Sequence, residues 1–303
     1  MERHDKGEGR GLILNIFVPT YHRPQKLKRC LCSIVENVEK TSRIWRKIWI
    51  HISNNDAEDK ETKEIGESFS ARYEYMFYHE NEKDIGIDAN HEMVYRYCSG
   101  DFALLVADDD IILPYGLEKM QSFCEEHDFL FAVCNSKNVQ DGKINQNSLY
   151  HLQKYAYTPL EAIKFFVFSK PGDLLPLLPY FGGVLINLNY MKKYSSHELR
   201  EVFSGTYHQY IGGLWNALLM SKEKHMCMIP DDIIGVGFDD DKTWFAYKDD
   251  VMNSAKFFYQ KLELPRHIRE DLELYFRYCN TRMRHFIAPY VRLKSLLWRA
   301  VRL

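Results

Sequence analysis

The sequence predicts an α/β protein with a mostly parallel sheet and helices on both of its faces. In the first half of the chain, short runs of apolar, β-branched and aromatic residues alternate with longer segments of helical periodicity. This alternation is typical of βαβ units, in which successive strands are parallel. With 303 residues, 46% of them hydrophobic and 27% charged, the chain can bury a core of the size that such a sheet requires.

The first half supplies strands and helices in turn. Residues 12–18 have the composition of a buried strand, and Pro19 is expected to end it. A helix is expected from Pro24, because proline is favoured in a first helical turn, with Leu27 and Leu31 on its apolar face. The same reasoning predicts strands at 47–52, 73–79 and 102–107, and helices at 57–70 and 88–98.

The pattern is looser beyond residue 135. Polar residues at 135–157 predict a hairpin. After a strand at 226–229, Asp231 and Asp232 predict a solvated turn, with a second metal site as the alternative. A further strand is expected at 180–186, with helices at 158–168 and 207–220. We therefore expect four regions: a polar tail (1–11), an α/β half (12–135), a second half of the same domain (136–248) and a C-terminal helical extension (249–303).

The composition argues against several classes of protein. A net charge of −2 provides no overall field for nucleic acid. The seven cysteines are scattered without the spacing of a zinc site, which predicts a reduced, cytoplasmic protein. The charged N-terminal residues do not resemble a signal peptide, and no apolar run approaches the ~20 residues that span a bilayer.

The C-terminal residues form a basic, amphipathic segment. No Asp or Glu follows Glu273, and seven Arg or Lys residues alternate with apolar residues that include Trp298. A basic helix of this kind favours peripheral contact with a membrane surface. The alternative is a terminal helix that packs on the body of the protein with its arginines solvated.

Three consecutive aspartates, Asp108, Asp109 and Asp110, follow the apolar run 102–107. Polar residues also follow the three strands predicted upstream, at 20–23, 53–56 and 84–90, and the carboxyl ends of parallel strands share one edge of a sheet. Adjacent carboxylates repel one another unless a cation lies among them. The sequence thus predicts a divalent-metal site beside an aromatic ring, a basic side chain and amides, which together suit a nucleoside diphosphate.

Four segments resemble the family 2 glycosyltransferases, which have the GT-A fold. They are residues 16–24, 52–56, 81–90 and 100–110, and they occur in the family's order and spacing. Within the family, the chain looks most like bacterial transferases that build O-antigen and capsule polysaccharides. The resemblance implies an inverting enzyme that uses Mn²⁺ or Mg²⁺ to move a sugar from a nucleotide-diphosphate sugar to a glycan hydroxyl. Together with the basic tail, it suggests a lipid-linked acceptor at the cytoplasmic face of the membrane.

The resemblance also assigns the donor-binding residues. Asn54 stands where the family usually has an aspartate that bonds the base, and an amide leaves uracil, thymine and cytosine all open. Asp110 matches the metal ligand of the D-x-D motif, with Asp108 as the ribose ligand and second metal candidate. The residues expected to bind the nucleotide sugar are Pro19, Thr20, Tyr21, Arg23, Asn54, Asn55, Asp84, Asp88, Asp108 and Asp109.

The catalytic base is harder to assign. The family usually supplies it from a Glu-Asp pair at a helix start, and the corresponding residues 203–210 contain no acid. His208 is the titratable group there, with an unperturbed pKa near ~6.5 that suits a general base. A histidine that only bonds backbone at a helix start is the alternative for this residue. Asp239 and Asp241, in a loop that follows Gly235 and Gly237, are rival candidates for the base.

Two other functions remain open from the sequence. A sugar nucleotidyltransferase would use a similar sheet and similar carboxylates, but it should have a glycine-rich loop after the first strand, and residues 19–24 contain no glycine. A protein that binds nucleotide sugars without catalysis would explain the missing Glu-Asp pair.

Overall fold

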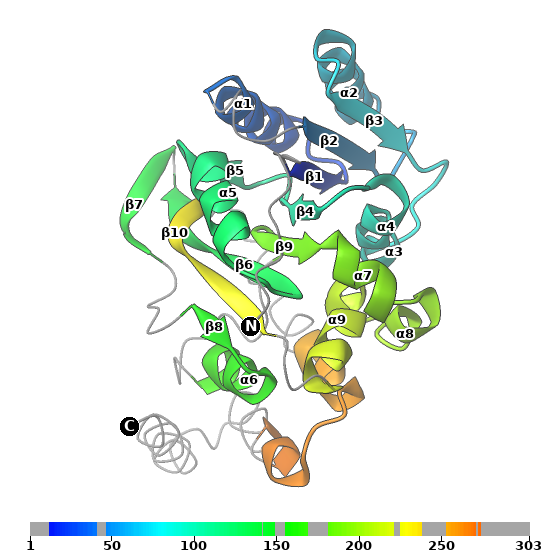
Figure 1. The fold of residues 1–303 in the computed structure, drawn as a ribbon. Coiled ribbons are helices and arrows are strands. Elements are labelled where there is room, and N and C mark those ends of the chain that lie inside the picture. Colours follow the sequence, from blue (N-terminus) through cyan, green and yellow to red (C-terminus); the bar gives the residue numbers. More distant parts are fainter. Residues whose placement is uncertain are drawn as a thin grey trace.

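The computed structural model of the chain describes residues 12–40, 47–140, 142–148, 155–168, 181–220, 225–237, 253–270 and 272–273. Within them the protein has a mixed α/β fold around one curved sheet (Figure 1). The strands lie in the order β3-β2-β1-β4-β9-β6-β10-β5, with β7 beside β6 and β8 beside β10. This arrangement confirms the predicted α/β class.

The first four strands form the parallel part of the sheet. β1 (Ile13–Thr20) lies between β2 (Lys47–Asn54) and β4 (Phe102–Leu105), and β3 (Met76–Glu80) pairs with the outer side of β2, all in parallel. Thr20 stands opposite Asn54 in this register. The carboxyl ends of these strands therefore meet at one edge, as the sequence predicts.

Pro19 does not end β1, contrary to the prediction. The strand continues to Thr20, with Pro19 opposite Ser53 of β2. Residues of a parallel strand face its two neighbours in alternation. Thr20 faces β2, since its carbonyl accepts from the N–H of Asn55, so Pro19 faces β4, whose ladder with β1 ends at Phe17. The missing N–H of proline therefore costs no hydrogen bond of the ladder.

Helices cover one face of the sheet with the apolar stripes that their sequences predict. α1 (Pro24–Lys40) buries Leu27 and Leu31, and α5 (Gly116–Glu126) buries Leu117 and Met120 in the same cluster. α2 (Lys60–Arg72) packs beside them near β3, as Figure 1 shows. Burying a side chain such as leucine contributes about 1.5–3 kcal/mol, so this layer stabilises the parallel half substantially.

The helix predicted at 88–98 is divided in two. α3 (Ile87–Glu92) and α4 (Val94–Tyr97) meet at Met93, whose N–H bonds the carbonyl of Asn90 three residues earlier. A tighter bond of this kind turns the chain at the junction. The division matters for the site, because α3 carries Asp88 and His91 toward the second half of the chain.

The second half of the sheet is mixed, which the prediction of a mostly parallel sheet did not anticipate. β9 (Val184–Asn187) lies antiparallel between β4 and β6 (Phe131–Gln140), and β10 (Met226–Gly237) returns parallel to β6. β5 (Ile111–Ile112) and β8 (Ala156–Tyr157) pair antiparallel with β10. The predicted hairpin is present as β6 with β7 (Lys143–Ser148).

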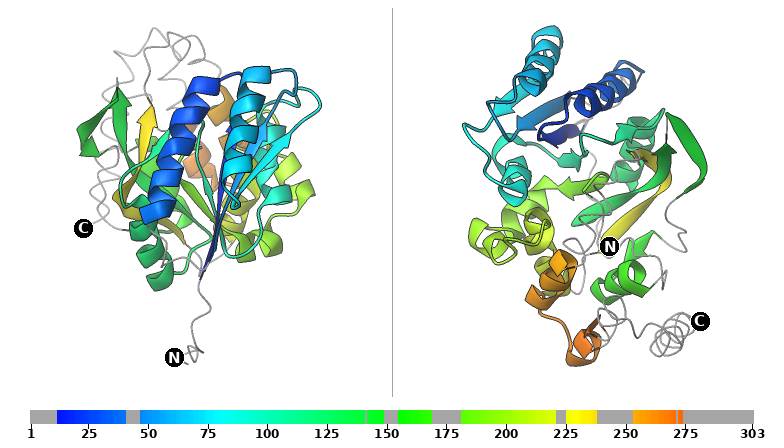
Figure 2. Two further views of the ribbon diagram at one scale, coloured as in Figure 1. Left: turned by 90° about the horizontal axis from the view of Figure 1, so that it is seen from above. Right: turned by 180° about the vertical axis from the view of Figure 1, so that it is seen from behind.

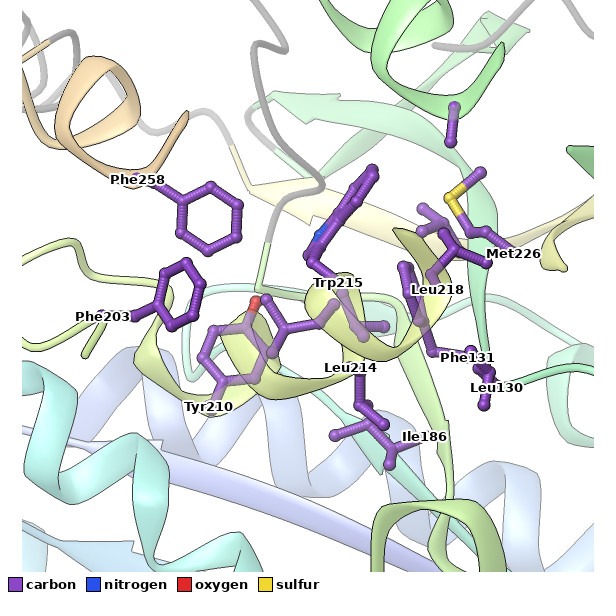
Figure 3. Packing of buried hydrophobic residues seen from close by; sticks show 14 of the residues in the cluster. Leu130, Phe131, Ile186, Phe203, Tyr210, Leu214, Trp215, Leu218, Met226 and Phe258 are labelled. Carbon is purple, nitrogen blue, oxygen red and sulfur yellow. The ribbon is translucent and has the colours of Figure 1, made fainter. Parts of the chain in front are cut away.

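A second helical layer covers the opposite face of the sheet (Figure 2). Its members are α6 (Pro159–Phe168), α7 (Leu188–Tyr194), α8 (His197–Glu201), α9 (Gln209–Met220) and helical residues within 253–270. α9 is apolar around most of its circumference, as expected of a helix buried on several sides. Figure 3 shows Tyr210, Leu214 and Trp215 of α9 among Phe131 and Ile186 of the sheet. The start of α9 is therefore held rigidly by the core.

Asp231 and Asp232 do not form a turn, which corrects the prediction. β10 continues through them with a shift of register against β6 between Ile229 and Ile234. Asp231 pairs with Lys119 at 3.5 Å, and Asp232 pairs with Lys137 at 3.4 Å. Ion pairing within an irregular strand therefore accounts for this acidic pair.

Two of the expected features lie outside the described residues: the basic tail beyond residue 273 and the 238–248 loop with Asp239 and Asp241. Among the residues that the structure does describe, no helix is both long and apolar enough to cross a membrane.

A buried polar cluster lies within the parallel half. His51 Nε2 contacts Asn15 Oδ1 at 3.3 Å, and His51 Nδ1 contacts His79 Nε2 at 3.2 Å. The ring of His79 stacks on Tyr97 with centroids 3.7 Å apart. Burial, with a smaller contribution from His79, lowers the pKa of His51 to about 4, so this imidazole is neutral in the folded protein at neutral pH.

We expect acidification to destabilise the protein through His51. Unfolded His51 takes up a proton below pH ~6.5, whereas folded His51 resists protonation until the pH falls to about 4. The free energy of unfolding therefore falls between these values, by up to ~1.4 kcal/mol per pH unit for one such group. His51→Gln, which keeps an N–H donor, should show a shallower dependence than the wild type in urea unfolding at pH 7 to 4.5. Parallel curves for the two proteins would contradict this assignment.

Candidate active site

The ends of β1 and β4 bring four of the predicted site residues into contact. Thr20 donates its hydroxyl to Asp108 Oδ2 at 2.8 Å. Arg23, in the loop before α1, places Nη1 3.1 Å from Asp108 Oδ1 and 3.3 Å from Asp109 Oδ2. Arg29 of α1 donates to the carbonyl of Asp109 at 2.8 Å. The predicted edge therefore exists, with two arginines against the aspartates.

The carboxyl groups of Asp108 and Asp110 are buried at this edge, and burial disfavours their charged forms. Burial raises the pKa of Asp108 to about 6, although Arg23 opposes the rise. Burial, reinforced by the neighbouring charge of Asp109, raises the pKa of Asp110 well above its ordinary value. A cation placed against these groups would restore their charged forms.

Asp110 occupies a tight position between two backbone segments. Its Oδ1 accepts from the N–H of Gly237 at the end of β10, at 3.0 Å, and a methyl group at residue 182 would collide with its Oδ2. Gly182, which has no side chain, therefore allows the backbone to approach the carboxylate of Asp110 closely.

These carboxylates fit a hard divalent cation. Oxygen donors are the ligands that Mg²⁺ and Mn²⁺ prefer, and Mg²⁺ commonly uses only one or two carboxylates together with waters and substrate phosphates. The described residues contain no group of three or more His, Cys, Asp or Glu side chains arranged around a common point. A metal held by Asp110 and Asp108 would therefore take its remaining ligands from a diphosphate and water.

The loop after β1 offers an exposed aromatic surface. The side chain of Tyr21 is exposed, and its ring meets that of His22 edge to face with centroids 4.4 Å apart. His22 Nε2 lies 2.8 Å from Asp56 Oδ2. Pro19, by contrast, is buried within β1. Of Pro19, Thr20 and Tyr21, which are all expected to bind the nucleotide sugar, Tyr21 is therefore the one with an exposed side chain.

Asn54 faces inward, which corrects its assignment to the base. The residue is fully buried, and its amide donates to the carbonyl of Asp56 at 2.9 Å and to the hydroxyl of Tyr78 at 3.1 Å. Its Oδ1 accepts from the N–H of Asp56 at 3.3 Å. Asn54 therefore builds the turn that presents Asp56, a residue that sequence reasoning missed. Its one signal was its place as the first acid after the strand.

Asn55 and Asp84 join two of the loops at this edge. Asn55 Nδ2 donates to Asp84 Oδ1 at 2.6 Å, and Asn55 Oδ1 accepts from the N–H of Ile85 at 3.3 Å. Asp84 also accepts from the N–H of Gly86 at 2.8 Å. Asp84 remains exposed beside Tyr21, while Asn55 is buried. The structure thus leaves Asp84 at the surface, where buried Asn55 holds its carboxylate in place.

The carboxylate of Asp88 is bonded to another part of the protein. The residue is buried at the start of α3, and its carboxylate accepts from backbone N–H groups of the loop before α9. Its predicted contact with the nucleotide sugar is therefore replaced by a contact within the protein, because α3 is directed toward the second half of the chain.

His208 lies immediately before α9. Its Nδ1 is 3.0 Å from the carbonyl of Thr206, which can only accept, so Nδ1 carries the proton of the neutral imidazole. The backbone bond that the sequence offered as an alternative role is therefore present. It also makes Nε2 the proton acceptor, which a general base requires. The two roles are compatible.

A short chain of aromatic contacts connects His208 with the aspartates. Phe181 adjoins Gly182, which packs on Asp110, and stacks on His91 with centroids 3.9 Å apart. The rings of Phe181 and Tyr210 are 5.1 Å apart, and those of His208 and Tyr210 are 6.2 Å apart. His208 therefore belongs to the same region as the carboxylate edge.

Comparisons with known proteins are consistent with this geometry. The model of Glycosyl transferase family 2 matches residues 15–174. None of the curated proteins matches the chain. Among solved structures, S. aureus TarS 1–349 is similar with a TM-score of 0.56 at 15% identity, covering 91% of this chain and 74% of that one. Its complex with UDP-GlcNAc has a TM-score of 0.59 at 15% identity, covering 91% and 75%. Its complex with UDP has a TM-score of 0.57 at 15% identity, covering 90% and 73%.

Proposed function

Since the chain belongs to glycosyl transferase family 2 and is a glycosyltransferase with a GT-A fold, we propose that it takes a nucleotide-diphosphate sugar as its donor. In this proposal the enzyme inverts the anomeric centre and depends on Mn²⁺ or Mg²⁺. The observation that carries the proposal is the cluster at the end of β4, where Asp108 and Asp110 are buried on either side of Asp109 and have raised pKa values, so that a divalent cation would stabilise their charged forms. The UDP and UDP-GlcNAc complexes of TarS support a nucleotide sugar as the donor.

In this proposal, the loops at the carboxyl edge bind different parts of the donor. The exposed ring of Tyr21 stacks on the base, and Asp56 and Asp84 lie beside it for the polar edge of the base. Thr20 and Arg23 hold Asp108, which bonds the ribose hydroxyls. Each of these side chains lies at the end of a strand of the parallel half or in the segment that follows it.

The departing diphosphate is negatively charged, so positive charge beside it would favour its departure. Asp110 and Asp108 would hold the metal, with Asp109 beside them. When bound, the metal neutralises the charge that develops on the departing diphosphate. Arg23, whose side chain is half exposed, adds a second positive charge at the same edge. This charge stabilisation acts mainly in the transition state, where it accelerates the reaction.

His208 removes the acceptor's proton in the proposed reaction. As the acceptor hydroxyl attacks the anomeric carbon, its proton passes to Nε2 and the sugar–diphosphate bond breaks, with the electron pair leaving on the diphosphate. No enzyme group becomes attached to the sugar, so one displacement inverts the configuration. Asp239 and Asp241 are the alternative bases.

The acceptor is proposed to be a lipid-linked glycan of a bacterial surface polysaccharide. The support is the sequence resemblance and the basic tail, which suits the anionic surface of the cytoplasmic membrane. In this proposal residues 12–135 bind the donor, residues 136–248 bind the acceptor, and residues 249–303 contact the membrane.

A donor panel tests the proposal directly. Purified protein is incubated with UDP-, GDP-, dTDP- and CDP-sugars, UDP-GlcNAc included, with Mn²⁺, with Mg²⁺ or with EDTA, and release of nucleoside diphosphate is measured. We expect slow hydrolysis of donors that share one nucleotide, only when metal is present. If no donor of the panel is bound or hydrolysed, the proposed donor class is wrong.

A further inference from the structure

The loop before α9 is held by a carboxylate from a distant part of the chain. Asp88 Oδ2 accepts from the N–H of Gly205 at 2.7 Å and from the N–H of Tyr207 at 3.3 Å, and its Oδ1 accepts from the N–H of Gln209 at 3.4 Å. Asp88 is distant from this loop in the sequence, since positions 88 and 205 differ by 117. One residue of α3 thus organises three backbone groups on both sides of His208.

The backbone of this loop is strained, and the carboxylate compensates for the strain. Tyr207 has a φ of 59° and Gly205 a φ of 79°. A left-handed conformation in a residue other than glycine costs about 1 kcal/mol or more, and it persists only where the surroundings impose it. In this conformation alternate N–H groups converge on one point, which forms an anion-binding concavity filled by Asp88.

The strained turn determines the orientation of the imidazole of His208. The carbonyl of Thr206 accepts from His208 Nδ1 at 3.0 Å and from Ser254 Oγ at 2.8 Å. Residue 206 lies between Gly205 and Tyr207, so its carbonyl direction depends on the turn that Asp88 holds. The position of His208 is therefore linked to Asp88 through the backbone.

The charge of Asp88 also acts on His208 directly. Among the residues that the structure describes, the groups near this imidazole include Asp88 and His91 of α3, Tyr210 of α9 and Phe258 of the helical residues after 253. Burial lowers the pKa of His91 to about 3, so His91 is neutral. Burial raises the pKa of Asp88, while the three backbone N–H groups and, to a smaller extent, the attraction to His208 oppose the rise. By the same attraction, a charged Asp88 stabilises the imidazolium that forms when His208 accepts a proton.

We propose that Asp88 is a positioning residue for His208. Asp88 holds the loop before α9 in its strained turn and stabilises the protonated imidazole of His208. The inference rests on the proposed function only in that His208 is taken as the general base. It changes the expected role of Asp88 from binding the donor to supporting the base. It also connects the donor half of the chain, through α3, with the chemistry in the second half.

An NMR titration tests the inference independently of turnover. In protein with labelled histidines, the signal of His208 is assigned by its absence in His208→Gln, and its midpoint is followed with pH. Asp88→Asn keeps the shape of the side chain but removes its charge, so we expect the midpoint to move about half a pH unit or more downward. Asp231→Asn is the matched control, because it makes the same change of charge at an exposed carboxylate of β10 that pairs with Lys119 of α5. We expect its midpoint to match the wild type.

Kinetics supply the second readout, with UDP-GlcNAc and the other donors of the panel as probes and water as the acceptor. Asp88→Asn should lower kcat about tenfold and leave KM for the donor unchanged, with the acidic limb of the kcat profile at lower pH. Asp88→Glu is the variant to measure if Asp88→Asn does not fold. It keeps the charge but moves it by one methylene, so we expect a midpoint near that of the wild type with a reduced kcat.

The outcomes separate the two proposals. A folded Asp88→Asn with an unchanged midpoint and an unchanged kcat overturns the role of Asp88, even in an active enzyme. A fully active Asp88→Glu would equally contradict positioning. If the midpoint moves as expected while the wild type turns over no donor, the link between Asp88 and His208 stands and the proposed function fails.

Discussion

Asp110→Asn is expected to abolish metal-dependent turnover while leaving the fold intact. The substitution removes the carboxylate charge that would hold the metal, and losing this charge stabilisation should cost about 10²–10³-fold or more in kcat. The amide keeps an oxygen to accept from Gly237 and is close in size to the carboxyl group. The effect is measured as the release of nucleoside diphosphate from the donor that the panel selects, at saturating and subsaturating Mn²⁺.

Stability distinguishes loss of function from loss of structure. The pKa of Asp110 is raised on folding, so the charged carboxylate is disfavoured in the folded protein and its penalty grows as the pH rises through the raised pKa. At neutral pH, Asp110→Asn should therefore unfold at the same or a higher urea concentration than the wild type. Asp231→Asn is the matched control, since Asp231 of β10 is an exposed carboxylate that pairs with Lys119 of α5. An Asp110→Asn variant with normal metal-dependent turnover would remove Asp110 from the metal site.

His208→Ala should have the second largest effect. A positioned general base contributes about 10²–10⁴-fold to the rate, and we expect a loss of kcat in this range with little change of KM for the donor. The reason is that, in the proposed reaction, His208 contacts the reacting hydroxyl rather than the nucleotide. Steady-state kinetics across pH 5.5–9 check this, because the acidic limb of the profile should disappear with the imidazole.

His197→Ala is the control for this substitution. His197 is the first residue of α8, and its side chain is exposed, with Nδ1 4.0 Å from Oε2 of Glu201. Replacing it should therefore leave turnover unchanged. If His208→Ala retains near-normal turnover, His208 is not the base. Asp239→Asn and Asp241→Asn are then the next variants to measure.

The fold and the carboxylate edge could be predicted from the sequence because local patterns determine them. Branched and aromatic runs specified β1, β2 and β4, and the parallel arrangement of such strands puts their carboxyl ends together. The contact of Thr20 with Asp108 follows from that register. The order of strands in the second half could not be predicted, because the antiparallel insertion of β9 between β4 and β6 depends on long-range packing.

Side-chain direction explains the errors in the site. Asn54 and Asp56 are two residues apart, and nothing local reveals that Asn54 turns inward to the hydroxyl of Tyr78 while Asp56 remains at the surface. Asp88 was misassigned for the same reason. Its partners, at positions 205, 207 and 209, are distant in the chain and are backbone groups, which have no sequence signature.

The central claim is that the end of β4 binds a nucleoside diphosphate together with a divalent metal. Calorimetric titration of the nucleoside diphosphate that the donor panel selects, with Mn²⁺ or with EDTA, tests it most directly. The account predicts binding to the wild type that is strong with Mn²⁺, much weaker in EDTA, and equally weak in both buffers for Asp110→Asn. Equal affinity in Mn²⁺ and EDTA for the wild type, or no binding of UDP, GDP, dTDP or CDP at all, would contradict it.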